Sequence, residues 1–321
     1  RGSGYRGGAL SGGGAGGAPC ASAHDSPSVA GSARLPVPTD DVLPWACGLG
    51  DGRLAACGVD GTVYLYDWER RCLAGSFRGH ARAANRLLPL GGGRLASASA
   101  DATVRVWRAP AAAPGAFEAP TSPELELVGH QMDVQALANL SGASDDCSAQ
   151  LVTGSRDCSV RLWDLATGVE LQQHKILRNI ITAVSHVPGQ PSVFVQASED
   201  LQLRLWDART KLQPTHAVRS GPNQLICLDV SDDGAYVACG SKGFSRENCE
   251  VKVFDLRTGL RELASGPCAD HTIEALRMVG SGRCLIASKD GYLRLVALPQ
   301  VSILQERGPA SAAYTALGVE R

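Results

Sequence analysis

The stretch LVTGSRDCSVRLWD, residues 151–164, decides the fold. It consists of a small apolar segment, a Ser-x-Asp turn, a second segment of alternating apolar residues, and a closing Trp-Asp pair. Alternation with a period of two predicts two β-strands, and the turn residues between them predict a hairpin. Related copies occur along the chain: LAACGVDGTVYLYD (54–67), LASASADATVRVWR (95–108), VQASEDLQLRLWD (195–207), CEVKVFD (249–255) and LIASKDGYLRLVA (285–297).

The turn aspartate gives these copies a period. The markers are Asp60, Asp101, Asp157, Asp200, Asn248 in place of Asp, and Asp290, with spacings of 41, 56, 43, 48 and 42 residues. A period of about 40–45 residues with Gly-His and Trp-Asp signals is typical of WD repeats, each of which forms one four-stranded propeller blade. Over residues 40–321 the chain therefore resembles the WD-repeat family. We expect an all-β WD-repeat β-propeller with six recognisable blades.

The resemblance also implies a buried hydrogen-bonded tetrad of His, Ser or Thr, Asp and Trp within a blade. The second and third copies fit it, as His80, Ser99, Asp101 and Trp107 and as His130, Ser155, Asp157 and Trp163. In the fourth copy Ser198, Asp200 and Trp206 are present without a histidine, which predicts an incomplete tetrad. The final GPASAAYTALGVER (308–321) resembles the start of a seventh blade, so we expect a propeller truncated at its C-terminus.

Composition limits the remaining possibilities. The 321 residues carry 31 basic and 32 acidic side chains, which argues against nucleic acid as a partner. No apolar run reaches the roughly 18 residues of a membrane span, and the eleven cysteines include no C-x-x-C. These features predict a cytoplasmic protein with no membrane span. Residues 1–38, with nine glycines in the first twenty, are expected to be a disordered tail, followed by the propeller at 39–321.

The residues His130, Ser155 and Asp157 include the types found in a hydrolase triad. The same types recur at the same offset in the second copy, and a catalytic site would not be repeated around a ring. Mutual hydrogen bonding of buried polar groups explains the pattern better. No Cys/His cluster has the spacing of metal ligands. We therefore expect no enzyme activity, no metal and no cofactor.

Two sets of residues are candidates for binding a protein partner. Trp206, Asp207 and Arg209 form a W-D-x-R box, with a weaker copy that ends at Arg257. The box resembles that of propellers that serve as substrate receptors of cullin-RING ubiquitin ligases, in which the arginine would contact the ligase adaptor. Alternatively, each arginine is an ordinary solvated residue after a strand.

The second set lies in the insertion KGFSREN, residues 242–248, and comprises Lys242, Phe244 and Arg246. Loops on a rigid scaffold often carry recognition, and aromatic and basic residues are enriched in binding hot spots. A plain solvated loop is the alternative. The inserted Gly-Phe…Cys-Glu pattern, with Arg178-Asn179 in place of Gly-His, is similar to a branch of the family whose members act in cilium assembly and ciliary trafficking. That resemblance implies a non-catalytic scaffold whose partners are ciliary trafficking components or regulators of small GTPases.

Overall fold

The computed structural model of the chain describes residues 43–110, 117–118, 122–140, 150–245, 247, 249–310 and 317. By its internal contacts the chain divides into residues 1–34 and 35–321, and everything described belongs to the second unit. The tail expected at residues 1–38 therefore lies outside the described residues. The described residues form strands and turns without a helix. No helix long and apolar enough to cross a membrane therefore occurs among them.

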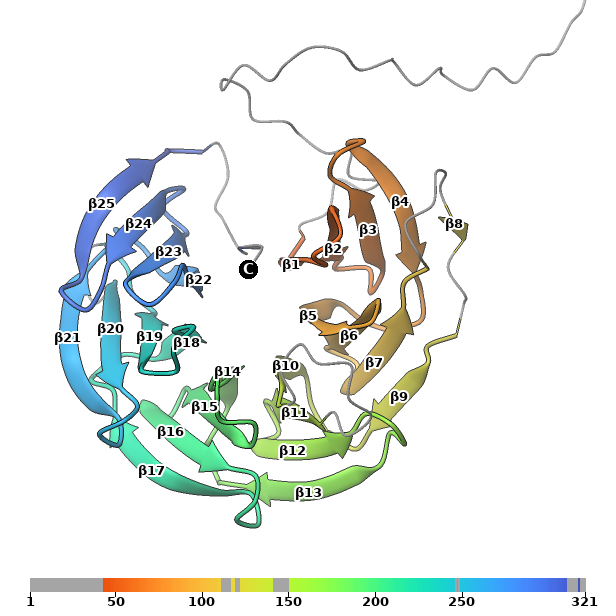
Figure 1. Cartoon of the computed structure of the whole chain (residues 1–321), viewed down its shortest axis with the longest axis horizontal. Helices are drawn as coiled ribbons and strands as arrows, with labels where there is room; N and C mark the ends of the chain where they lie inside the picture. Colours follow the sequence, from red (N-terminus) through yellow and green to blue (C-terminus); the bar gives the residue numbers. More distant parts are fainter. Residues whose placement is uncertain are drawn as a thin grey trace, which may run out of the picture. The chain divides into compact units, whose positions relative to one another are not determined.

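The described strands form six sheets arranged around a common axis (Figure 1). Each sheet contains four antiparallel strands. The two-stranded parallel pairing of β8 with β4 extends the first sheet. The strands are as follows: blade 1, β1 (Trp45–Gly48), β2 (Arg53–Cys57), β3 (Val63–Asp67) and β4 (Cys72–Phe77), with β8 (Phe117–Glu118); blade 2, β5 (Ala84–Gly91), β6 (Arg94–Ser99), β7 (Thr103–Arg108) and β9 (Leu125–Val128); blade 3, β10 (Val134–Asn139), β11 (Gln150–Ser155), β12 (Ser159–Asp164) and β13 (Glu170–Lys175); blade 4, β14 (Ile181–His186), β15 (Val193–Ser198), β16 (Gln202–Asp207) and β17 (Gln213–Arg219); blade 5, β18 (Leu225–Val230), β19 (Tyr236–Ser241), β20 (Glu250–Asp255) and β21 (Arg261–Pro267); blade 6, β22 (Ile273–Met278), β23 (Arg283–Ser288), β24 (Leu293–Ala297) and β25 (Ser302–Arg307).

The all-β propeller predicted from the repeats is confirmed, with six blades. Five of the repeated motifs coincide with the second and third strands of one blade, and the shorter fifth copy (249–255) coincides with the third strand of blade 5 alone. A seventh blade is not shown. Of the segment in which its opening strand was expected, only residues 308–310 and Leu317 are described. Leu317 is buried among side chains of blades 1 and 6.

The core consists of apolar layers between consecutive blades. One such layer joins blades 3 and 4 and contains Val160, Ile181 and Trp206, and equivalent layers lie between the other neighbouring blades. In blades 2, 3 and 4 the tryptophan of the third strand packs toward the preceding blade; Trp107, for example, stacks on Phe77 of blade 1 with ring centroids 5.2 Å apart. Burying these faces is the main favourable term that holds the blades together.

The turn after the second strand has the same backbone conformation in five blades. The residue that follows the turn aspartate has a positive φ in each case: Gly61 (81°), Ala102 (68°), Cys158 (69°), Leu201 (67°) and Gly291 (82°). The aspartate stabilises this turn by accepting the backbone N–H of the residue two positions on, as Asp157 does from Ser159 at 2.9 Å. The repeated aspartate is thus needed for the turn, whatever else it contacts.

Candidate functional site

The third blade contains a buried network that links a histidine to its tryptophan. His130 Nδ1 lies 3.0 Å from Asp157 Oδ2, and His130 Nε2 lies 2.7 Å from Thr153 Oγ1. The indole Nε1–H of Trp163 donates to the same threonine oxygen at 2.9 Å. A carboxylate only accepts, so His130 donates from Nδ1, and in the neutral imidazole Nε2 accepts the threonine hydroxyl proton. Blade 2 repeats the arrangement with His80, Ser97, Asp101 and Trp107.

The sequence pattern predicts the wrong hydroxyl for the tetrad in both blades. Ser97 and Thr153 complete the networks, and the predicted Ser99 and Ser155 do not. The Ser99 hydroxyl donates to the backbone carbonyls of Arg82 and Ala83 and accepts the N–H of Asp101; Ser155 makes the equivalent contacts in blade 3. Residues two apart in a strand point to the same side, so the sequence alone does not distinguish them.

Neither network has the geometry of a hydrolase. Both ring nitrogens of His130 are engaged, and Ser155, the serine of the triad-like set, contacts backbone rather than the histidine. The side chains of His130 and Asp157 are 2% and 4% exposed, which leaves no room for a substrate. Burial opposes the charged form of Asp157, but hydrogen bonds from His130, Ser159 and Gln131 outweigh it and lower the pKa of this carboxyl. The described residues also contain no group of three or more His, Cys, Asp or Glu placed to hold a metal.

The fourth blade has a complete network built from different residues, which corrects the expectation of an incomplete tetrad. Trp206 donates to Gln196 Oε1 at 2.9 Å, and Gln196 Nε2 donates to Asn179 Oδ1 at 2.7 Å. Arg204 donates to the same Asn179 oxygen at 2.9 Å and forms an ion pair with Asp200. Asn179 is thus in the place of the histidine, and Arg204 supplies the donor for the turn carboxylate.

Arg204 lies four residues after the turn aspartate, and this position follows a rule around the ring. In blades where a histidine is hydrogen-bonded to the turn aspartate, the basic residue at this position pairs with a glutamate of the outer strand, as Arg105 does with Glu126. In blades where no histidine is bonded to the turn aspartate, the side chain four residues after the aspartate donates a hydrogen bond to it. The three such pairs are Tyr64 with Asp60, Arg204 with Asp200 and Arg294 with Asp290; Arg294 also pairs with Glu306 of the outer strand.

The W-D-x-R candidates divide into buried and exposed residues. Trp206 is fully buried within the network, so its prediction as a partner-binding residue is wrong. Arg209 is 73% exposed and donates two hydrogen bonds to Asp207, at 3.0 and 2.6 Å. Arg257 is 62% exposed, pairs with Asp255 and also donates to the Tyr236 hydroxyl at 3.3 Å. Both arginines are accessible, and each is held by an aspartate of its own strand.

The insertion between β19 and β20 is a small hairpin with an aromatic residue at its surface. Phe244 and Glu247 exchange backbone hydrogen bonds of 3.2 and 3.0 Å. The Phe244 ring is 69% exposed and makes an edge contact with His271, at a centroid distance of 5.2 Å. Lys242 is exposed and donates to Gln224 at 3.3 Å. Arg246 lies outside the described residues.

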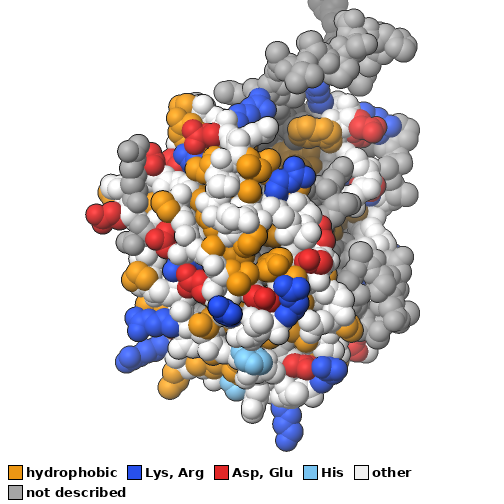
Figure 2. Space-filling model, turned by 60° about the vertical axis from the view of Figure 1, so that its left-hand side comes forward, with side chains coloured by type: hydrophobic (Ala, Val, Ile, Leu, Met, Phe, Trp, Pro, Cys, Tyr) orange, Lys and Arg blue, Asp and Glu red, His pale blue; other side chains and the backbone are white. Residues whose placement is uncertain are grey.

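The two candidate surfaces lie at opposite ends of the blades. The Phe244 hairpin precedes β20 and the second arginine box follows it, and a strand of six residues spans roughly 17–20 Å. They therefore belong to opposite faces of the ring. On the side shown in Figure 2, basic and acidic side chains are interspersed, with apolar side chains between them. A surface of that kind is suited to protein partners rather than to a polyanion.

Six four-stranded blades, three of which contain a buried network that links turn, strand and tryptophan, define a WD-type β-propeller. Residues 71–108 and 121–164 match the family model described as "WD domain, G-beta repeat". Over 227 residues the chain is 33% identical to WD repeat-containing protein 81 of Danio rerio, an alignment that covers 68% of this chain and 10% of that protein. It is 29% identical over 180 residues to Coronin-7 of Mus musculus, covering 55% of this chain and 18% of that protein.

A third relative is Nuclear distribution protein PAC1 of Arthroderma benhamiae, 31% identical over 285 residues, which cover 77% of this chain and 56% of that protein. The chain thus spans between a tenth and a little over half of the length of these relatives. With the fold, these matches identify the chain as a member of the WD-repeat family. WD-repeat proteins generally act as scaffolds for protein–protein interaction.

Proposed function

We propose that this propeller is a non-catalytic scaffold that binds partner proteins through the face that carries the Phe244 hairpin. The exposed Phe244 ring is the observation that carries the proposal. A large aromatic side chain that is 69% exposed on a loop of a rigid ring offers apolar area with little loss of side-chain entropy on binding. The chain on either side of this loop is anchored in the apolar layers of blade 5, which include Cys239 and Cys249.

We further propose that the scaffold acts in cilium assembly and ciliary trafficking. This proposal rests on the sequence pattern of residues 177–257, with Gly243, Phe244, Cys249 and Glu250, which resembles the ciliary branch of the WD-repeat family; the three relatives compared above carry other names. On this proposal the protein is cytoplasmic with a ciliary fraction. Its partners are ciliary trafficking components or regulators of small GTPases.

The experiment is a quantitative affinity purification from ciliated cells, using wild type, Phe244→Ala and Trp68→Ala. Trp68 is an exposed aromatic residue, 57% accessible, in the turn after β3, where the face opposite to the Phe244 hairpin begins. The proposal predicts that wild type and Trp68→Ala enrich ciliary transport proteins and that Phe244→Ala recovers at least fivefold less of them. Equal recovery by all three proteins, or no ciliary component with wild type, would contradict it.

A second candidate function is that of a substrate receptor of a cullin-RING ubiquitin ligase. The observation that favours it is the repetition of an exposed arginine, oriented by an aspartate two residues earlier, in the adjacent blades 4 and 5. An arginine oriented in advance loses less freedom when it binds an acceptor on an adaptor.

This candidate is tested by co-purification of the ligase adaptor with wild type and with the double variant Arg209→Ala/Arg257→Ala. The receptor function predicts that the adaptor is recovered with wild type and lost with the double variant. Lys242→Ala serves as a matched control, because it removes a positive charge from the opposite face. If adaptor and cullin are not recovered with wild type, or are recovered equally with the double variant, this function is excluded.

A further inference from the structure

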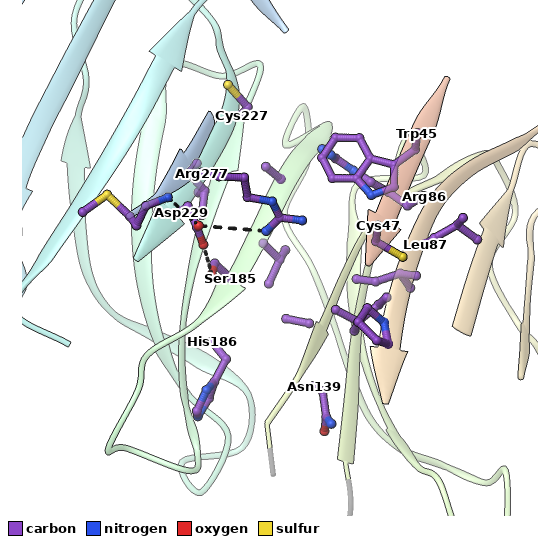
Figure 3. A pocket seen from close by; sticks show the side chains of 18 of the residues that line it. Trp45, Cys47, Arg86, Leu87, Asn139, Ser185, His186, Cys227, Asp229 and Arg277 are labelled. Atoms are coloured by element: carbon purple, nitrogen blue, oxygen red, sulfur yellow. Dashed lines mark hydrogen bonds and ion pairs between the residues drawn. The ribbon is translucent and has the colours of Figure 1, made fainter. Parts of the chain in front are cut away.

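The inner strands of all six blades line a central cavity of about 460 Å³ (Figure 3). Trp45 of blade 1 and Arg86 of blade 2 lie on one side of it, and Asp229 of blade 5 and Arg277 of blade 6 lie across from them. Apolar side chains such as Leu87, together with other residues of the inner strands, complete the wall. A cavity of this size is in the range that takes a small molecule.

Arg86 is held in the wall without a carboxylate partner. Its Nε donates to the carbonyl of Gln135 at 2.9 Å, and its Nη2 donates to that of Thr182 at 3.2 Å. The guanidinium lies 3.8 Å from the centroid of the Trp45 ring. Burial, with a smaller effect of Arg277, lowers the pKa of Arg86 to about 10, so the group remains charged at neutral pH. No acidic residue among the described part of the chain lies within ion-pair distance of it.

The carboxylate that does line the cavity is already engaged. Asp229 Oδ2 accepts the backbone N–H of Met278 at 2.9 Å, and Oδ1 accepts the hydroxyl of Ser185 at 3.4 Å. Arg277 Nη1 lies 3.9 Å from Asp229, which is too long for a direct hydrogen bond. Two guanidinium groups therefore face one carboxylate, and the lining carries a surplus of one positive charge.

The indole of Trp45 adds a neutral donor to this surplus. Trp45 is 7% exposed, and its Nε1–H has no hydrogen-bond acceptor among the described residues. An indole N–H can only donate, and buried donors in proteins are normally paired. The ring lies 3.8 Å from the Arg86 guanidinium and 5.5 Å from that of Arg277. The cavity thus contains one indole N–H without an acceptor among the described residues and two guanidinium groups. The guanidinium groups donate only to backbone carbonyls: Arg86 to those of Gln135 and Thr182, and Arg277 to that of Leu317 at 3.5 Å.

We propose that the central cavity binds a small monocarboxylic acid, whose carboxylate accepts hydrogen bonds from Arg86, Arg277 and the Trp45 N–H. A guanidinium group matches the planar geometry of a carboxylate. A single negative charge neutralises the surplus, whereas a dianion would be repelled by Asp229. The apolar part of the wall, including Leu87, accommodates the hydrocarbon portion of the acid.

The test is isothermal titration calorimetry and thermal unfolding of the full chain with butyrate, with butyramide as neutral analogue and inorganic phosphate as a more highly charged anion, at constant ionic strength. Butyrate is expected to bind and to raise the unfolding temperature, while butyramide and phosphate do neither. Arg86→Gln should weaken butyrate binding at least tenfold. Arg108→Gln, the same substitution at a site that is 61% exposed and outside every candidate surface, should leave it unchanged.

Arg86 also donates to two backbone carbonyls, so Arg86→Gln could fail to fold. Trp45→Phe keeps the aromatic ring beside both guanidinium groups and removes only the N–H, and it should weaken butyrate binding several-fold in a folded protein. The proposal is overturned if wild type does not bind butyrate at millimolar concentration. It is also overturned if phosphate or butyramide binds as well as butyrate, or if folded Trp45→Phe binds as tightly as wild type.

Discussion

Blades 3 and 4 bury the same tryptophan with different chemistry. In blade 3 a histidine links Trp163, through Thr153, to the turn carboxylate of Asp157. In blade 4 two amide side chains and Arg204 make the link to Asp200, so a full positive charge is buried at 4% exposure. The two blades nevertheless have the same strand order and the same turn conformation. What the fold requires is a donor for the turn aspartate and an acceptor for the indole, rather than particular residues.

The largest difference is expected when the turn carboxylate loses its charge. Asp200→Asn leaves the buried Arg204 without a counter-ion, which should lower the free energy of unfolding by about 3–5 kcal/mol. Asp157→Asn leaves no buried arginine without a counter-ion; it weakens the hydrogen bonds from His130, Ser159 and Gln131 and should cost about 1–3 kcal/mol. Urea unfolding of both variants measures the difference. An equal or greater loss for Asp157→Asn would show that Arg204 does not depend on Asp200.

Acid should affect the histidine-containing blades. Burial raises and hydrogen bonding lowers the pKa of Asp101 and Asp157, and the net shift is downward for both carboxyls. A carboxyl whose pKa is lower in the folded protein than in the unfolded chain stabilises the fold at pH values above its unfolded pKa of about 4. This stabilisation is lost as the pH falls toward the pKa of the folded protein. Asp101→Asn/Asp157→Asn should therefore be less stable than wild type near pH 7 and lose less stability between about pH 5 and pH 2.

The matched control for the acid prediction is Glu262→Gln, which removes an exposed carboxylate from the outer strand of blade 5. Its stability should follow the same pH dependence as wild type. Urea midpoints measured across the pH range distinguish these curves. If the double variant declines as steeply as wild type, the two networks are not the source of the acid sensitivity.

The acceptors of the two indoles give a smaller contrast. Trp206→Phe leaves Gln196 Oε1 buried without a donor, whereas Trp163→Phe leaves Thr153 still bonded to His130. Both substitutions remove similar apolar area, so the blade 4 variant should be the less stable of the two by about 1 kcal/mol. Thermal or urea unfolding of the two variants is sufficient to test this. A larger loss for Trp163→Phe would contradict the contacts described for Gln196.

The smallest effect concerns the turn shared by the blades. Ala102 has a φ of 68°, a conformation in which Gly61 and Gly291 occur in other blades. Ala102→Gly should relieve the strain of the left-handed backbone conformation at this position. The greater conformational freedom of glycine in the unfolded chain offsets part of this gain, so the net stabilisation should be about 0.5 kcal/mol. The reverse change, Gly61→Ala, should destabilise it, because a new Cβ would lie 2.6 Å from the Arg82 carbonyl oxygen. Stabilisation by Gly61→Ala would be inconsistent with this turn geometry.

The repeats were sufficient to predict the blades because turn and strand signals are local. The turn aspartate and the aromatic residue six positions later mark the second and third strands of blades 1 to 4, and the structure has them there. The tetrad hydroxyls were not predictable in the same way. Ser97 and Ser99 lie on the same side of one strand, and only the cross-strand register, in which Leu95 faces Trp107, brings Ser97 within reach of the indole.

The blade 4 network was missed for a different reason. Asn179 and Gln196 are not the residue types of the family motif, and their partnership depends on the spatial approach of residues 17 positions apart. One signal was available in the sequence: a basic or tyrosine side chain follows the turn aspartate by four residues in blades 1, 2, 3, 4 and 6. Such a side chain donates to the turn aspartate only in the blades where no histidine is hydrogen-bonded to that aspartate.

Hydrogen–deuterium exchange of the chain with and without a captured partner tests most directly which part of the ring binds. If the Phe244 hairpin is the recognition element, the partner slows exchange in residues 242–249 and leaves the turns at 207–212 and 255–260 unchanged. Protection confined to those turns, with residues 242–249 exchanging as in the free protein, would contradict the account and assign binding to the opposite face.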